Sequence, residues 1–126
     1  MNAKAIDLLD AVESGLSVVS AGLQSIDRAL GDDQDSRDIC RMLREECGDV
    51  CADLRRIRCG QVNIGSNNFA SIVDALSDLL VHSRCFATLS QRSVCDGSGQ
   101  DLLQPLVAAV DRLDEPLSAL KKMAPQ

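Results

Sequence analysis

Apolar side chains recur along this chain at every third and fourth residue, the spacing that places them on one face of an α-helix. Four stretches carry this pattern, and they predict helices over residues 3–30, 36–58, 67–91 and 101–123. In the first stretch the apolar positions are Leu9, Val12, Leu16, Val19, Leu23, Ile26 and Leu30. Each predicted helix therefore has one apolar seam and a polar outer surface.

Residues suited to start a helix stand at the breaks between these stretches. Asp35 or Ser36 can accept hydrogen bonds from the first amides of the second helix, and Ser66, Asn67 or Asn68 can do so for the third. These caps support the predicted helix starts.

Two prolines interrupt the fourth stretch. Pro105 is expected in or just after the first turn, where few amide groups have partners within the helix. Pro116 lies inside the apolar pattern, so it should kink or restart the helix, with Asp114 as the new cap.

The seams of the first and second helices align as facing layers, and so do those of the third and fourth. In the same alignment, Asp27 meets Arg44 and Glu13 meets Arg58 beside the seam of the first pair. Apolar layers and flanking charges thus agree on one register. The prediction is an all-α single domain over residues 1–126, an antiparallel up-and-down four-helix bundle made of two helical hairpins.

A second stripe on the first helix consists mostly of small residues. Small side chains let another backbone approach closely, so the stripe indicates either a tight contact inside the bundle or a groove for a partner helix. The stripe comprises Ala11, Gly15, Val18, Gly22, Ser25 and Ala29.

Few charges occur on the third helix. Between residues 61 and 91 only Asp74, Asp78 and Arg84 are formally charged. The helix is therefore either the most enclosed in the bundle or part of an oligomer interface, and we expect a homodimer.

Composition and charge restrict the function. The chain has 126 residues, a net charge of −6, and 2% aromatic residues. Negative charge and scarce aromatic rings disfavour direct nucleic-acid binding and favour a basic protein partner. No apolar run is long enough to span a membrane, and acidic residues interrupt the N-terminal segment, so a cytoplasmic location with reduced cysteines is expected.

Cysteines at helical spacing suggest one kind of chemistry. Cys47 and Cys51 are one turn apart, and Cys40 lies about two turns earlier. This spacing resembles that of copper-storing helical bundles, which line their cores with cysteine. The alternative is that Cys40 and Cys47 pack as small apolar groups, because they occupy seam positions.

The single histidine, His82, is expected on the polar flank of the third helix with Asp78 one turn before it. An acidic helical bundle of this length with an exposed histidine resembles histidine phosphotransfer domains. The third and fourth residues after His82 are Cys85 and Phe86, where those domains have Lys and Gly. The alternative is a solvated surface histidine.

Arginines recur along one strip of the second helix and can bind phosphate or an acidic partner, or form a salt-bridged surface with neighbouring carboxylates. They are Arg37, Arg41, Arg44, Arg55 and Arg58.

No catalytic set, metal motif or cofactor motif is present. The sequence therefore favours a non-enzymatic protein-interaction module, such as a small regulator, adaptor or phage inhibitor. The alternative is a phosphotransfer-like or cysteine-based metal carrier.

Overall fold

The described chain is almost entirely helical. A computed structural model describes residues 3–29, 34–93 and 97–124, with the backbone alone described for residues 91–93 and 97–102. The elements are α1 (Ala3–Ala29), α2 (Gln34–Arg58), α3 (Asn67–Ser93), α4 (Gly97–Arg112) and α5 (Asp114–Met123). Within these ranges there is no strand, which confirms the predicted all-α class.

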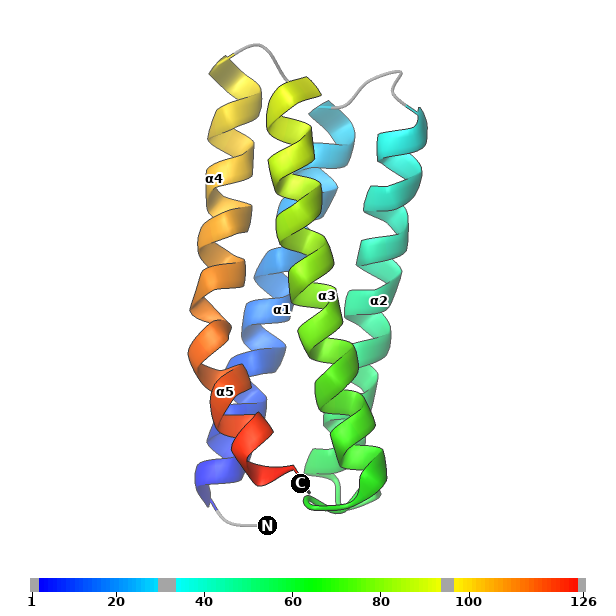
Figure 1. The fold of residues 1–126 in the computed structure, drawn as a ribbon, viewed down its shortest axis with the longest axis vertical. Coiled ribbons are helices and arrows are strands. Elements are labelled where there is room, and N and C mark those ends of the chain that lie inside the picture. The colour runs from blue at the N-terminus through cyan, green and yellow to red at the C-terminus, as the bar shows by residue number, and fades with distance from the viewer. Residues whose placement is uncertain (1–2, 30–33, 94–96, 125–126) are drawn as a thin grey trace.

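The long helices lie side by side along the long axis of the molecule (Figure 1). α1 packs against α2 and α4, and α3 packs against the same two helices. The connection between α2 and α3 lies at the end of the molecule where α1 begins and α5 finishes (Figure 1). Surface grooves lie between α1 and α2 and between α2 and α3. The first is lined by Arg44 and Arg55, and the second by Asp78 and His82.

The apolar seams form one shared core. Every predicted seam position that the structure describes is at most 8% exposed, from Leu9 in α1 to Leu120 in α5. α3 buries ten described side chains, against seven in α1 and six in α2. Its low charge is thus accounted for by enclosure. Leu30, the last predicted seam position of the first helix, lies outside the described residues.

The caps differ in part from those predicted. α2 begins at Gln34, so Asp35 and Ser36 lie within its first turn and neither is the residue that precedes the helix. Ser66 does precede α3, and its Oγ accepts a hydrogen bond of 3.1 Å from the amide of Phe69. Because this bond satisfies one of the otherwise unpartnered first amides, Ser66 is the cap among the three predicted candidates.

Pro116 restarts the last helix, as predicted, but Asp114 does not cap it. The residue before α5 is Leu113, which makes no side-chain cap bond, and Asp114 is the first residue of α5. The carboxylate of Asp114 instead bonds Arg84 on α3. A salt bridge to a neighbouring helix thus replaces the local cap.

Pro105 lies inside α4 and not near its first turn, because α4 begins at Gly97, four residues before the predicted start. Its side chain is exposed, so the ring faces away from the core.

Of the two ion pairs predicted between α1 and α2, one is present. Glu13 Oε2 lies 3.2 Å from Arg58 Nη1, as expected. Asp27 does not meet Arg44 but lies 3.3 Å from Nε of Arg37. An arginine side chain can span about one 5.4 Å helical turn. The layer position alone therefore does not decide which arginine reaches a carboxylate.

Two glycines of the small-residue stripe allow α4 and Leu113, the residue that follows it, to approach α1. A Cβ atom added at Gly22 would lie 3.6 Å from Leu106, and one at Gly15 would lie 2.9 Å from Cγ of Leu113. Tight contact inside the bundle therefore accounts for both glycines. Gly48 in α2 is different, because a Cβ atom there would have nothing within 4 Å.

Alanine substitutions at Gly15 and Gly48 should have opposite effects on stability. Gly15→Ala should lower the free energy of unfolding by about 1–3 kcal/mol, because the buried Leu113 side chain has to move. Gly48→Ala should raise it by about 0.5–1 kcal/mol, because the helix gains propensity and no contact is disturbed. Urea unfolding of the two variants and the wild type measures both effects. Equal stabilities would show that the contact with α4 does not constrain residue 15.

Candidate functional site

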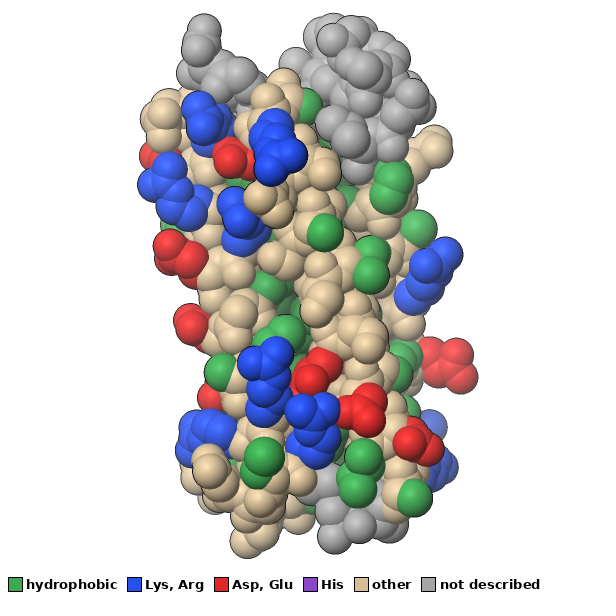
Figure 2. Space-filling model, turned by 180° about the vertical axis from the view of Figure 1, so that it is seen from behind, with side chains coloured by type: hydrophobic (Ala, Val, Ile, Leu, Met, Phe, Trp, Pro, Cys, Tyr) green, Lys and Arg blue, Asp and Glu red, His purple; other side chains and the backbone are tan. Residues whose placement is uncertain are grey.

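The predicted arginine strip of α2 is mostly neutralised by carboxylates. Arg37 pairs with Asp27 of α1, Arg41 lies 4.0 Å from Asp38, and Arg55 and Arg58 contact Glu13. Figure 2, which shows the molecule from behind, has its basic side chains in separate groups with a hollow between them. The strip is therefore interrupted, and most of it is a salt-bridged surface.

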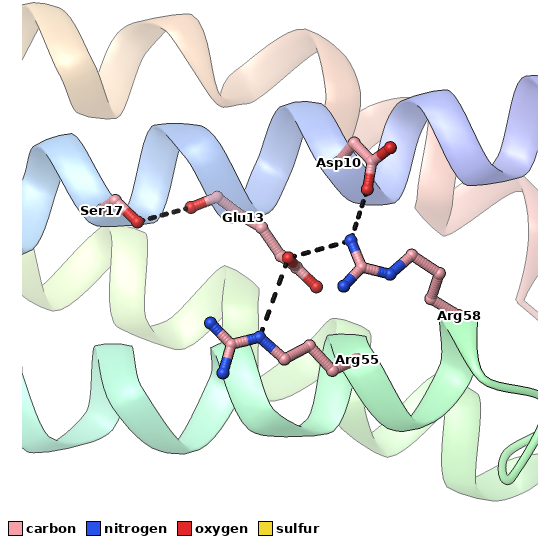
Figure 3. Close-up of polar contacts among 5 residues, drawn as sticks. All are labelled: Asp10, Glu13, Ser17, Arg55 and Arg58. Atoms are coloured by element: carbon pink, nitrogen blue, oxygen red, sulfur yellow. Dashed lines mark hydrogen bonds and ion pairs between the residues drawn. The ribbon is translucent and has the colours of Figure 1, made fainter.

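Glu13 connects Arg55 and Arg58 through its carboxylate. Its Oε2 atom lies 3.2 Å from Nη1 of Arg58 and 3.9 Å from Nε of Arg55, and Arg58 also bonds Asp10 at 2.5 Å (Figure 3). The bond with Asp10, assisted by the charge of Glu13, raises the pKa of Arg58 above its ordinary value. The side chain of Glu13 is only 15% exposed, and its other oxygen, Oε1, is buried without a hydrogen-bond partner.

Arg44 differs from the other four predicted arginines. Among the described residues it forms no ion pair, and its Nε atom is buried without an acceptor. A buried donor without a partner costs about 1–3 kcal/mol. Arg44 is thus the cation of this surface whose hydrogen-bonding capacity is least used.

Arg44 lines a cleft of about 330 Å³ between α1 and α2, here called the arginine cleft. Its lining residues are Leu16, Ser17, Ser20, Arg44, Cys47, Gly48, Cys51 and Arg55. Leu16, Cys47 and Cys51 are its apolar lining residues. The cleft thus combines an apolar floor, two hydroxyl groups and two guanidinium groups.

Burial keeps the thiols in and near the cleft protonated. It raises the pKa of Cys47 to about 12 and that of Cys40 to about 11, and it also raises the pKa of Cys51. The Cys40 thiol donates to the carbonyl oxygen of Leu23, 2.8 Å away. Since the thiolate is the form that binds metals, these thiols are poorly prepared as ligands at neutral pH. No group of three or more potential metal ligands occurs in the part of the chain that the structure describes.

His82 and Asp78 lie in a second groove, between α2 and α3. Both are exposed, as expected for His82 on the polar flank of α3. This acidic groove, of about 320 Å³, is lined by Glu46, Asp49, Val50, Asp53, Ala75, Asp78 and His82. His82 and Asp78 are therefore grouped with carboxylates of α2, and they do not line the arginine cleft.

Exposed apolar side chains were not singled out from the sequence. Ile39 and Met42 precede Glu46 on the same helical strip of α2, and Leu89 follows His82 two turns later on α3. Their exposed fractions are 45%, 58% and 59%. The sequence signal that could have identified them is their helical spacing from Glu46 and His82. This spacing places each of them on the same helix face as a groove residue, so apolar side chains extend both sides of the groove.

Comparison with known proteins gave no match: neither a family model nor a curated protein nor a solved structure is similar to this chain. Of the helices described here, none has the length and apolar character needed to cross a membrane.

The raised thiol pKa values predict a loss of stability in alkali. Between the ordinary thiol pKa of 9.0 and the value of about 12 for folded Cys47, the folded protein retains a proton that the unfolded chain has lost. Stability present below pH 9 should therefore fall as the pH rises, by up to about 1.4 kcal/mol per pH unit for each such thiol.

Urea unfolding between pH 8 and 11 measures this slope. Cys47→Val should have a shallower slope than the wild type, whereas the exposed Cys59→Val should leave it unchanged. Identical slopes in all three proteins would contradict the assigned role of Cys47.

Proposed function

We propose that this chain is a non-enzymatic protein-interaction module that binds a basic, amphipathic segment of another protein along the α2–α3 surface. The observation that carries the proposal is the continuity of the acidic groove with exposed apolar side chains. Such a surface complements a partner whose cationic and apolar residues are segregated along its length.

The charge of the groove is free to attract a partner. Glu46, Asp49 and Asp78 form no ion pair with any described residue, whereas Asp53 is paired with Arg56. Together with the net charge of −6, these carboxylates would speed the encounter with a basic surface. A basic partner would also relieve the repulsion between neighbouring carboxylates.

The apolar part of the surface would supply binding energy. Met42 and Leu89 are more than half exposed, and Ile39 nearly so. Burial of such side chains yields roughly 25 cal/mol per Å² of apolar area, and the flexible Met42 side chain can adapt to a partner. Apolar anchors beside a charged groove are therefore favourable for docking a helix.

The fold is proposed to be an antiparallel up-and-down bundle of two helical hairpins, α1 with α2 and α3 with α4 and α5. The α2–α3 surface would then lie where the two hairpins meet. The Glu13–Arg58 and Asp27–Arg37 contacts support the first pairing, and the contacts of Arg84 with Asp111 and Asp114 support the second. Each hairpin would contribute one side of the acidic groove.

A partner other than a second copy is favoured. A two-fold dimer through this surface would bring like-charged grooves together, and the low charge of α3 already has an explanation in burial. A cytoplasmic location remains our proposal, since the free thiols of the described cysteines suit a reducing compartment.

The carrier hypothesis has less physical support. Carboxylates of the acidic groove surround His82, and they would repel a phosphoryl group on its ring. For metal carriage, the raised pKa values of Cys47 and Cys51 oppose formation of the thiolates.

Affinity capture from the native host should test the interaction surface. The double variant Met42→Asp and Leu89→Asp should lose at least tenfold of the partner recovered by the wild type, because each change places a charge in the apolar contact. Glu46→Lys with Asp49→Lys should do the same by reversing the charge. Quantitative mass spectrometry of the captured proteins measures these losses.

Val18→Asp is the matched control, since Val18 is an exposed apolar residue of α1, 52% exposed, outside this surface. It should capture the partner like the wild type. Equal recovery by all variants, or no captured partner under any condition, would contradict the proposal.

A further inference from the structure

We propose that the arginine cleft binds a small elongated organic dianion, with an acidic group at each end and an apolar middle. The site lies on the opposite edge of α2 from the acidic groove, so it is independent of the proposed interaction surface.

The presence of glycine at residue 48 is the first argument for a ligand in the arginine cleft. Two further glycines inside helices, Gly15 and Gly22, are explained by close contacts with Leu113 and Leu106. A side chain at residue 48 would meet no atom within 4 Å, so packing within the chain does not require glycine there. A glycine in the middle of a helix weakens that helix. What Gly48 provides is an opening in the wall of the arginine cleft.

The unused hydrogen-bonding capacity of Arg44 is the second argument for a ligand. Its Nε donor is buried and lacks an acceptor, and no described carboxylate pairs with it. A bound carboxylate or phosphate would satisfy this donor and neutralise the charge in one contact, which a guanidinium group makes in a bidentate geometry.

Arg55 supplies the second cation. Among the described residues, Arg55 forms one ion pair, the 3.9 Å contact between its Nε atom and Glu13. Figure 3 shows its terminal nitrogen atoms extending away from Glu13 along α2, on the side where Ser17 lies on α1. These nitrogen atoms can therefore donate into the arginine cleft, which Arg55 and Ser17 both line.

The spacing of the two cations defines the shape of the ligand. Arg44 and Arg55 are eleven residues apart, a helical rise of about 16 Å before their side chains reach inward. One small anion would contact a single arginine, whereas a molecule with two acidic ends can contact both. The lining of the cleft includes the apolar side chains of Leu16 and Cys47, and also Ser17 and Ser20. The Ser17 hydroxyl donates to the carbonyl oxygen of Glu13. A volume of about 330 Å³ suits a small molecule.

Glu13 opposes anion binding at the Arg55 end of the cleft, and this predicts a specific effect of removing its charge. Its carboxylate is within 3.9 Å of Arg55, so a bound anion competes with it. Removal of the charge by Glu13→Gln should strengthen dianion binding at least threefold, an effect that a merely structural carboxylate would not produce.

Titrations followed by amide and arginine Nε–H resonances test the site at constant ionic strength. The probes are α,ω-dicarboxylates of four to ten carbons, the matching bisphosphates, hexanoate and inorganic phosphate. We expect saturable shifts at Gly48, Arg44 and Arg55, and an optimum chain length for the dianions. Hexanoate and inorganic phosphate should bind at least tenfold more weakly. The two dianion series distinguish a carboxylate ligand from a phosphate ligand.

Variants complete the test. Arg44→Met should reduce dianion affinity at least tenfold without loss of stability, because the Nε atom has no partner to lose. Gly48→Leu should block the cleft while the melting temperature stays at or above that of the wild type. Arg41→Met, on an exposed arginine paired with Asp38, should leave binding unchanged. Shifts that are independent of chain length, or binding retained by Gly48→Leu, would overturn the proposal.

Discussion

The interaction on which the whole structure depends is the burial of aliphatic side chains that recur at intervals of three and four residues. Aromatic side chains make up only 2% of the chain, so leucine, valine, isoleucine, alanine and cysteine fill most of the interior, together with Phe69 and Phe86. The described seam residues are nearly all sealed from solvent. Apart from the hydroxyls of Ser83 and Ser90 and the thiols, the buried side chains carry no hydrogen-bonding groups, so the core fixes the positions of the helices and the charged chemistry is left to the grooves between them.

The close contact between α1 and α4 is a consequence of that core. Gly15 allows Leu113 to approach α1 at the same place where the chain breaks between α4 and α5. Arg84 of α3 then holds the region from the outside through Asp111 and Asp114. The helix break at Leu113, three residues before Pro116, is thus supported by packing on one side and by charge on the other.

α2 separates two surfaces of opposite character. Its edge toward α1 carries Arg44 and Arg55, and its edge toward α3 carries Glu46 and Asp49. Along the sequence these charges are interleaved, but a rotation of 100° per residue separates them in space. One helix can therefore serve an anion-binding cleft and a cation-attracting groove without the two neutralising each other.

The sequence by itself determined the all-α class, the approximate helix bounds and the buried positions, because helical periodicity is a local property that every seam residue repeats. It also indicated that Pro116 would kink or restart a helix and that His82 would lie on the polar flank of the third helix. Only the tertiary structure decided which arginine pairs with Asp27, which glycines face α4, and that Arg44 lacks a described partner. These outcomes depend on the distances between helices and on the reach of long side chains, and neither is encoded in the spacing of residues along one helix.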